Sequence, residues 1–275
     1  RIEKEMKTKE KIPVSVNVLG LSTVHMKGRE DAEEIRRLLS LCGIRVISMP
    51  GGGSNWEDIM DAPSASLNIV VRDELGLSLA KQMEQDFGTP YMSCGFPYGT
   101  DGTVAWLSEI IEKLGAGELT RASHEAAKLK EFLLRKGNNL ESLWGPLWFD
   151  AVLISAPPSE ALGIAEAIRS EWIDTARLCI HAQCETEKST PAADAIRVVM
   201  KNEKEIAKDY EDWQGGLVLS SSHETHLFRR MGRSFTGFHI ALPSHDEVHF
   251  SDLPQCGLRG AGYLYEQLWN AKLRR

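Results

Sequence analysis

Two histidines near the C-terminal end of the sequence, His223 and His226, could carry chemistry. They follow the apolar run LVLSSS and stand three residues apart, with Glu224 between them. That spacing on a helix places both imidazoles on one face, which suits proton delivery or a metal ion. Polar residues at a helix start also serve simply as caps, and this alternative stays open.

A second polar group, His245, Asp246 and His249, lies in the segment PSHDEVHFSDLPQCG. The segment is long for a connection between a strand and a helix. Long polar loops at the carboxyl edge of a sheet carry function more often than short ones do. We therefore treat these three residues as candidate catalytic residues, with an ordinary surface loop as the alternative.

Gly51, Gly52 and Gly53 follow the apolar segment RVISMP. A glycine turn that opens a helix lets an anion approach backbone amides, so these residues are candidates for cofactor binding. The turn lacks the lysine of a P-loop and the spacing of a dinucleotide fingerprint. A tight turn between strand and helix is the interpretation that we favour.

Cys94 stands at the end of the expected strand PYMSCG, beside glycines and a proline. A thiol there could bind a cofactor or react, although a lone cysteine is more often simply packed. The five cysteines are scattered without CxxC pairs or the spacing of iron–sulfur ligands. We assign no metal ligand from the sequence.

Strand-like apolar runs alternate with amphipathic, helix-like segments along the chain. This pattern predicts an α/β fold with two doubly wound parallel-sheet (Rossmann-like) domains. The expected strands are 14–20, 45–50, 66–71, 90–95, 149–156, 177–183, 215–221 and 235–242. The expected helices are 30–43, 76–86, 100–114, 160–172, 191–210, 223–232 and 260–273, with a short helix after the glycine turn.

The expected domain organisation has four parts. Residues 1–13 form a charged N-terminal join to upstream sequence, 14–117 a first α/β domain, 118–145 a helical connector and 146–275 a second α/β domain. Ligands of such sheets bind at the carboxyl ends of the strands, where the candidate residues above fall.

Composition narrows the class of protein. The 275 residues carry a net charge of −7, which disfavours nucleic acid as a partner. No apolar run is long enough to span a membrane. The scattered cysteines and the absence of a secretion signal predict a cytoplasmic protein.

Two groups of segments carry a resemblance to a known family. PGGGSNWEDIMDAPSASLNIV and FGTPYMSCGFPYGTDGTVAWLSEI resemble the middle domain of nitrogenase component 1 proteins. LVLSSSHETHLFRRMG and FHIALPSHDEVHFSDLPQCGLRGAGYLYEQLWNA resemble their last domain. The order of these segments is specific, and the resemblance covers roughly residues 14–117 and 146–272. The spacing of Pro243, Asp246 and His249 ahead of Gly257 is closer to the β-type subunits.

This resemblance implies a subunit of a nitrogenase-like reductase, an oxidoreductase without its cluster-binding first domain. The family pairs homologous subunits in α2β2 assemblies around iron–sulfur clusters, in some members with a larger metallocofactor, and takes electrons from an ATP-hydrolysing iron protein. In that setting the four histidines would donate protons or line a cavity. The cluster would be held mainly by the missing domain or by the sister subunit.

Arg72 marks a departure from the family pattern. It follows LNIVV, where α-type subunits place a cysteine that binds the cofactor. An arginine there would suit a carboxylate or another anion, although exposure to solvent is the plainer expectation. Two other functions stay open: a non-catalytic scaffold for metallocofactor assembly, and a two-lobed binding protein of the periplasmic type.

Overall fold

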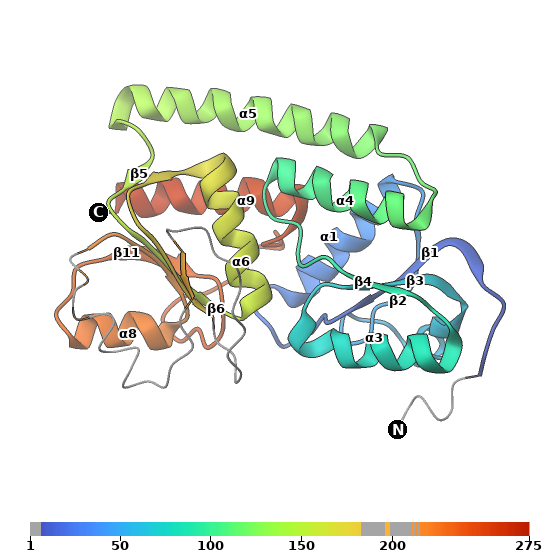
Figure 1. The fold of residues 1–275 in the computed structure, drawn as a ribbon. Helices are drawn as coiled ribbons and strands as arrows, with labels where there is room; N and C mark the ends of the chain where they lie inside the picture. The colour runs from blue at the N-terminus through green and yellow to red at the C-terminus, as the bar shows by residue number, and fades with distance from the viewer. Residues whose placement is uncertain (1–6, 183–195, 199–210, 212, 214, 275) are drawn as a thin grey trace. The chain divides into compact units, whose positions relative to one another are not determined.

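The computed structural model describes residues 7–182, 196–198, 211, 213 and 215–274. The chain forms two compact units, each built around its own sheet (Figure 1). Unit 1 comprises Arg1–Glu131 and Leu253–Ala261, and unit 2 comprises Phe132–Asp252 and Gly262–Arg275. Each unit is described by itself below.

The sheet of unit 1 has four parallel strands in the order β2-β1-β3-β4. They are β1 (Ile12–Leu19), β2 (Arg45–Ser48), β3 (Ala65–Val70) and β4 (Tyr91–Ser93). The central strands β1 and β3 are mostly buried, as expected when helices cover both faces. The register pairs Leu19 with Val70, so these two strands end together at one edge.

Helices cover both faces of this sheet. They are α1 (Gly28–Leu41), the short α2 (Trp56–Asp61), η2 (Ala62–Ser64), α3 (Asp73–Phe87) and α4 (Thr100–Leu114). α3 lies on one face, and α1 and α4 lie on the other (Figure 1). α3 and α4 end at Gly88 and Gly115, whose left-handed backbone is the usual helix stop. The long α5 (Thr120–Trp144) contributes residues to both units.

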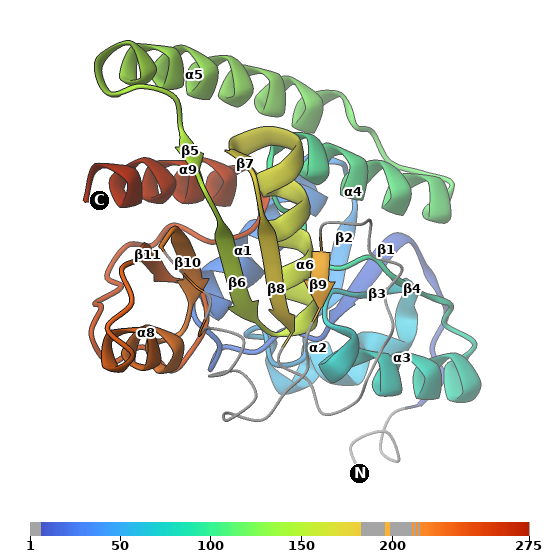
Figure 2. The same ribbon diagram turned by 60° about the vertical axis from the view of Figure 1, so that its left-hand side comes forward.

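The sheet of unit 2 has five parallel strands in the order β11-β10-β6-β8-β9, which can be followed in Figure 2. They are β6 (Val152–Ala156), β8 (Leu178–Ala182), β9 (Ile196–Val198), β10 (Leu217–Ser220) and β11 (Thr236–His239). A separate two-stranded sheet joins β5 (Trp148–Phe149) to β7 (Asp174–Thr175).

The sheet of unit 2 runs between α6 (Pro158–Ala167) and α8 (Ser222–Arg230) (Figure 1). A π-helical turn (Ile168–Trp172) extends α6, and the last helix is α9 (Gly257–Leu273). An aromatic core holds α8 against the strands. In it, the ring of Phe228 lies 5.9 Å from Trp213 and 5.5 Å from Phe235, both at edge-to-face angles.

The structure confirms the predicted fold class, because two all-parallel sheets are flanked by helices. One predicted element is wrong in part: residues 196–198 were expected inside a helix and form strand β9. The sequence Ile-Arg-Val suits a strand, and β8 offers it a parallel partner. The remainder of the expected helix 191–210 lies outside the described residues. The four-part domain division stays a prediction.

Candidate functional site

The polar segments predicted to carry function in unit 2 follow neighbouring strands. His223 and His226 come after β10, and the segment 245–249 comes after β11. β10 and β11 are adjacent and parallel, so both segments begin at the carboxyl edge of the sheet. This edge is where open α/β sheets bind their ligands.

His239, the last residue of β11, is the centre of a polar cluster at this edge. It is 2% exposed and was not selected from the sequence. Its Nδ1 lies 2.8 Å from Ser244 Oγ, and its Nε2 lies 3.4 Å from both Thr225 Oγ1 and Asp246 Oδ1. Its backbone N–H donates to Glu247 Oε2 at 3.0 Å. The ring is therefore held on both sides.

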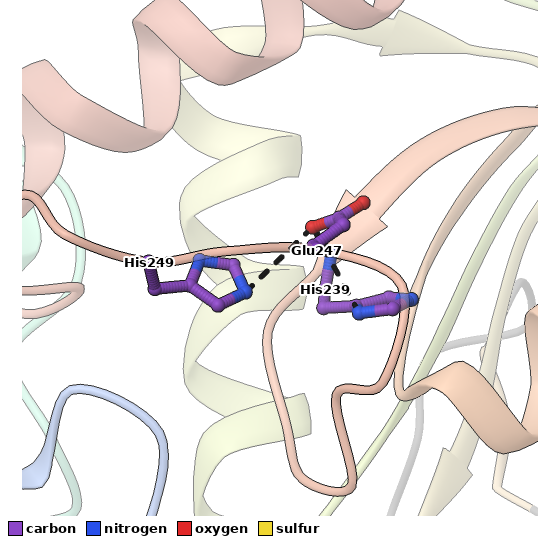
Figure 3. Close-up of side chains that lie close together, drawn as sticks. All are labelled: His239, Glu247 and His249. Carbon is purple, nitrogen blue, oxygen red and sulfur yellow. Dashed lines mark hydrogen bonds and ion pairs between the residues drawn. The ribbon is translucent and has the colours of Figure 1, made fainter.

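Glu247 joins His239 to His249. Its Oε2 atom lies 3.8 Å from His239 Nδ1 and 3.8 Å from His249 Nε2 (Figure 3). Ser244 Oγ lies 3.3 Å from the same His249 nitrogen. We call His239, Ser244, Asp246, Glu247 and His249 the histidine cluster. It combines two imidazoles with two carboxylates, groups that can transfer protons or hold a divalent metal ion.

Asp246 is anchored by Arg229 from α8. The guanidinium Nη1 donates to Asp246 Oδ2 at 2.6 Å. Partial burial alone would raise the pKa of Asp246, but the hydrogen bond from Arg229 and the charges of His239 and Arg229 lower it on balance. Asp246 is therefore a stable carboxylate at neutral pH, directed at His239.

The start of α8 fixes the loop that carries the cluster. Ser221 forms a capping box with Glu224, whose carboxylate also accepts from Ser155 Oγ at 2.9 Å. Ser222 anchors the loop after β11 by two hydrogen bonds. Its backbone N–H and its hydroxyl donate to the carbonyl of Pro243 at 2.8 and 2.9 Å. The peptide bond before Pro243 is cis.

The structure brings together only part of the predicted set. Asp246 and His249 belong to the histidine cluster, while the side chains of His223, His226 and His245 are exposed. His239 and Glu247 were not among the candidate residues inferred from the sequence. His239 lies inside the expected strand FTGFHIAL, and the available signal was a polar residue in the carboxyl half of that strand, since strand ends at this edge carry ligands.

The glycine turn of unit 1 follows β2 and is closely packed. At Gly51 φ is 77°, and an added Cβ would lie 2.3 Å from the carbonyl oxygen of Leu21. The backbone N–H of Thr23 donates to the Gly51 carbonyl at 2.9 Å. Gly52 is crowded by side chains, since an added Cβ would meet Leu21 Cδ1 at 2.7 Å and Leu21 Cβ at 3.1 Å, whereas no atom lies near the Cβ position of Gly53. Packing thus accounts for two of the three glycines.

Arg72 follows β3 and is 1% exposed, so the expectation of a solvent-facing arginine is wrong. Its Nη1 donates to the carbonyl of Gly20 at 3.1 Å, and its guanidinium carbon lies 4.4 Å from the centre of the Phe96 ring. β3 carries Arg72 into the carboxyl edge, where Phe96 covers it. A buried guanidinium at this edge is compatible with anion binding, and that role of Arg72 stays a proposal.

Cys94 follows β4, and its thiol is a weak donor to the carbonyl of Val70 at a distance of 3.9 Å. Burial is the main cause that raises the pKa of Cys94 to about 12 from its ordinary value of 9.0. The thiol is therefore protonated at neutral pH, and a role as a thiolate ligand would require it to lose that proton.

Alkylation of Cys94 is expected to be slow. At about pH 8 the folded protein should react with iodoacetamide at Cys94 roughly a thousandfold more slowly than the denatured chain, because the raised pKa leaves that much less thiolate. The rate in the folded protein should rise about tenfold per pH unit up to the raised pKa, whereas the rate in the denatured chain should level off above its ordinary pKa. Peptide mass spectrometry of the alkylated protein measures the reaction rate of Cys94. Equal rates in folded and denatured protein would contradict a buried Cys94 thiol with a raised pKa.

The described cysteines do not fit an iron–sulfur cluster held by this chain alone. Among the residues that the structure describes, no three cysteines converge on one point; the one group of three or more potential ligands is His239, Glu247 and His249. Burial also raises the pKa of Cys42 and Cys256, which disfavours their thiolate forms. Cys184 lies outside the described residues.

The two parallel sheets with helices packed on them define a doubly wound α/β protein. The sequence profile of a family described as "Nitrogenase component 1 type Oxidoreductase" matches residues 1–273, and the chain belongs to that family. The family resemblance inferred from the sequence is thereby confirmed.

Curated relatives and solved structures agree with this family. The chain is 25% identical to a light-independent protochlorophyllide reductase subunit of Chlorobium phaeobacteroides (strain BS1), over 97% of this chain and 52% of that protein. It is 25% identical to the corresponding protein of Prosthecochloris aestuarii, over 94% of this chain and 51% of that protein. A structure titled "Nitrogenase Cp1 at pH 6.5" matches with a TM-score of 0.71 and 16% identity, over 99% of this chain and 63% of that chain.

The chain thus spans about half the length of the curated relatives that it matches. The structural match supports the fold. Among the described helices, none combines the length and the apolar character that a membrane crossing requires.

Proposed function

We propose that the protein acts as a β-like subunit of a nitrogenase-like reductase in the cytoplasm. In this proposal a homologous sister subunit completes an α2β2 assembly, and an ATP-hydrolysing iron protein supplies electrons. The observation that carries the proposal is the family match over residues 1–273, since every element of both sheets falls within it. The relatives named as protochlorophyllide reductase subunits agree with it.

An iron–sulfur cluster would receive the electrons when bound. The sister subunit or another part of the protein would hold it, because the described cysteines do not. What this chain would supply are binding and proton-donating groups at the carboxyl edge of each sheet. In unit 1 the candidate binding residues are Gly51, Gly52, Gly53, Arg72 and Cys94.

In unit 2 we assign proton supply to His223 and His226. Both imidazoles are exposed on the first turns of α8, and multi-electron reduction consumes protons together with electrons. His245, Asp246 and His249 would shape the loop beside them. Imidazole is the side chain whose ordinary pKa allows proton transfer in both directions near neutral pH.

The double variant His223→Gln and His226→Gln tests this assignment. We expect it to lower the rate of product formation about tenfold in the full-length complex, assayed with reduced iron protein, MgATP and protochlorophyllide as the probe substrate. The first electron transfer from the iron protein, measured in a single turnover, should stay unchanged because the variant removes proton donors only, whereas steady-state oxidation of the iron protein should slow together with product formation. Product formation by absorbance and oxidation of the iron protein are measured in parallel.

The matched control is His124→Gln, because His124 is exposed on α5 and has no place at a carboxyl edge. It should behave like the unmodified protein. A double variant that forms product at the unmodified rate would remove the two histidines from the mechanism. An unmodified complex that binds a cluster but accepts no electrons from the iron protein would favour the scaffold function instead.

A further inference from the structure

We propose that the histidine cluster is a mononuclear metal site, in which His239, Glu247 and His249 bind one divalent ion of the zinc type. The inference concerns the described residues of unit 2 and stands independently of the reductase proposal. It requires no iron–sulfur cluster and no partner subunit.

The three side chains already converge. One atom from each, the two imidazole nitrogens and a carboxylate oxygen, lies within 4.8 Å of the other two. The glutamate oxygen is 3.8 Å from each imidazole nitrogen (Figure 3). Ligand bonds of about 2.0–2.2 Å in a tetrahedral zinc site place neighbouring ligand atoms roughly 3.3 Å apart. Binding an ion would therefore require each glutamate contact to close by about half an ångström, and the two imidazole nitrogens, which lie within 4.8 Å of each other, to move closer together.

The outer contacts of His239 resemble those of a metal-bound histidine. Its Nε2 faces Asp246 Oδ1 at 3.4 Å, and Arg229 fixes that carboxylate at 2.6 Å. A histidine that binds a metal through one nitrogen commonly gives its other N–H to a carboxylate, which sets the tautomer. With the proton on Nε2, Nδ1 keeps a lone pair that can bind an ion, and the ligand atoms of Glu247 and His249 lie within 4.8 Å of it.

Ser244 lies close to the ligand nitrogens of both histidines. Its hydroxyl is 2.8 Å from His239 Nδ1 and 3.3 Å from His249 Nε2. An ion bound there would either take the Ser244 hydroxyl as its fourth ligand or displace it by rotation of the Ser244 side chain.

The donor set and the burial select the class of ion. Two imidazole nitrogens and one carboxylate suit zinc and similar first-row ions, while calcium and magnesium prefer oxygen ligands throughout. The His239 side chain is 1% exposed, but those of His249 and Glu247 are 20% and 31% exposed. One side of the site is therefore open to a water molecule, the usual arrangement when three protein ligands hold zinc.

Binding of Zn²⁺ to metal-depleted full-length protein tests the proposal. We expect one ion per chain that depends on the cluster, with affinity reduced at least a hundredfold in His249→Gln and in Glu247→Gln. Both substitutions are at partly exposed side chains, so folding should survive, and circular dichroism verifies it. Titration calorimetry gives affinity, and elemental analysis after desalting gives stoichiometry.

His245→Gln is the matched control, since His245 lies in the same loop with its side chain exposed. It should bind Zn²⁺ like the unmodified protein. Zn²⁺ should also raise the melting temperature of the unmodified protein and of His245→Gln, but not of the two ligand variants. Equal Zn²⁺ binding by all four proteins, or no binding by the unmodified protein, would overturn the proposal.

Discussion

Asp31→Ala is expected to destabilise the protein by about 3–5 kcal/mol, because it removes a buried charge that holds several donors. Asp31 lies on α1 and is 2% exposed. Its Oδ1 accepts from the backbone N–H groups of Gln255 at 2.7 Å and Cys256 at 3.0 Å. These two residues directly precede α9, so the carboxylate holds the chain where it enters the helix and lies near the positive end of the helix dipole, which stabilises its negative charge.

Further hydrogen bonds hold the start of α9 beside the Asp31 contacts. Glu34, also buried on α1, accepts from the backbone N–H of Arg259 at 3.2 Å, and the carbonyl of Pro97 accepts from Gly257 at 2.7 Å. Loss of Asp31 leaves the amides of residues 255 and 256 buried without their acceptor. Their hydrogen exchange should accelerate together with the loss of stability.

Urea unfolding followed by circular dichroism and hydrogen exchange at residues 255 and 256 measure this prediction. Glu33→Ala is the control, because Glu33 is exposed on the same helix, and its effect should stay within about 0.5 kcal/mol. If Asp31→Ala were as mild as Glu33→Ala, the carboxylate would not be what holds the start of α9.

Arg72→Leu is expected to cost about 3 kcal/mol, because a fully buried guanidinium is lost from the carboxyl edge of unit 1. The Gly20 carbonyl would lose a charge-assisted hydrogen bond, and Phe96 would lose the cation above its ring. For a protein of this size that loss corresponds to a melting temperature lower by roughly 6–12 °C.

Calorimetry or thermal melting measures the effect of Arg72→Leu, with Arg36→Leu at an exposed position of α1 as the control. The control should melt within about 2 °C of the unmodified protein. An Arg72→Leu protein of unchanged stability would show that the buried guanidinium does not hold the fold. A role confined to anion binding would then be the better account.

Much of the fold follows from local sequence patterns. Apolar runs such as LNIVV give strands buried on both faces, and glycines such as Gly88 and Gly115 stop helices where their left-handed backbone is needed. Residues 196–198 show the limit of this reasoning. The helix-like sequence pattern around them led to the prediction of a helix. The strand depends on pairing with β8, which lies in a different segment of the chain.

The histidine cluster was harder to predict, because its geometry depends on contacts between segments. The sequence identified the polar loop, with Asp246 and His249 in it. It did not identify His239, because in the sequence this residue has the pattern of an ordinary strand residue. Only the structure shows that β11 ends at His239 and that its ring contacts Ser244 in the loop. Arg72 shows the same limit, since only the fold places Phe96 over it.

The proposed reductase function is tested most directly by electron transfer into the purified complex. Full-length protein with its sister subunit, isolated anaerobically, is mixed with reduced iron protein in a stopped-flow spectrometer, with and without MgATP. The account predicts oxidation of the iron protein that requires both MgATP and the complex. Iron-protein oxidation that is the same with and without the complex would contradict the account.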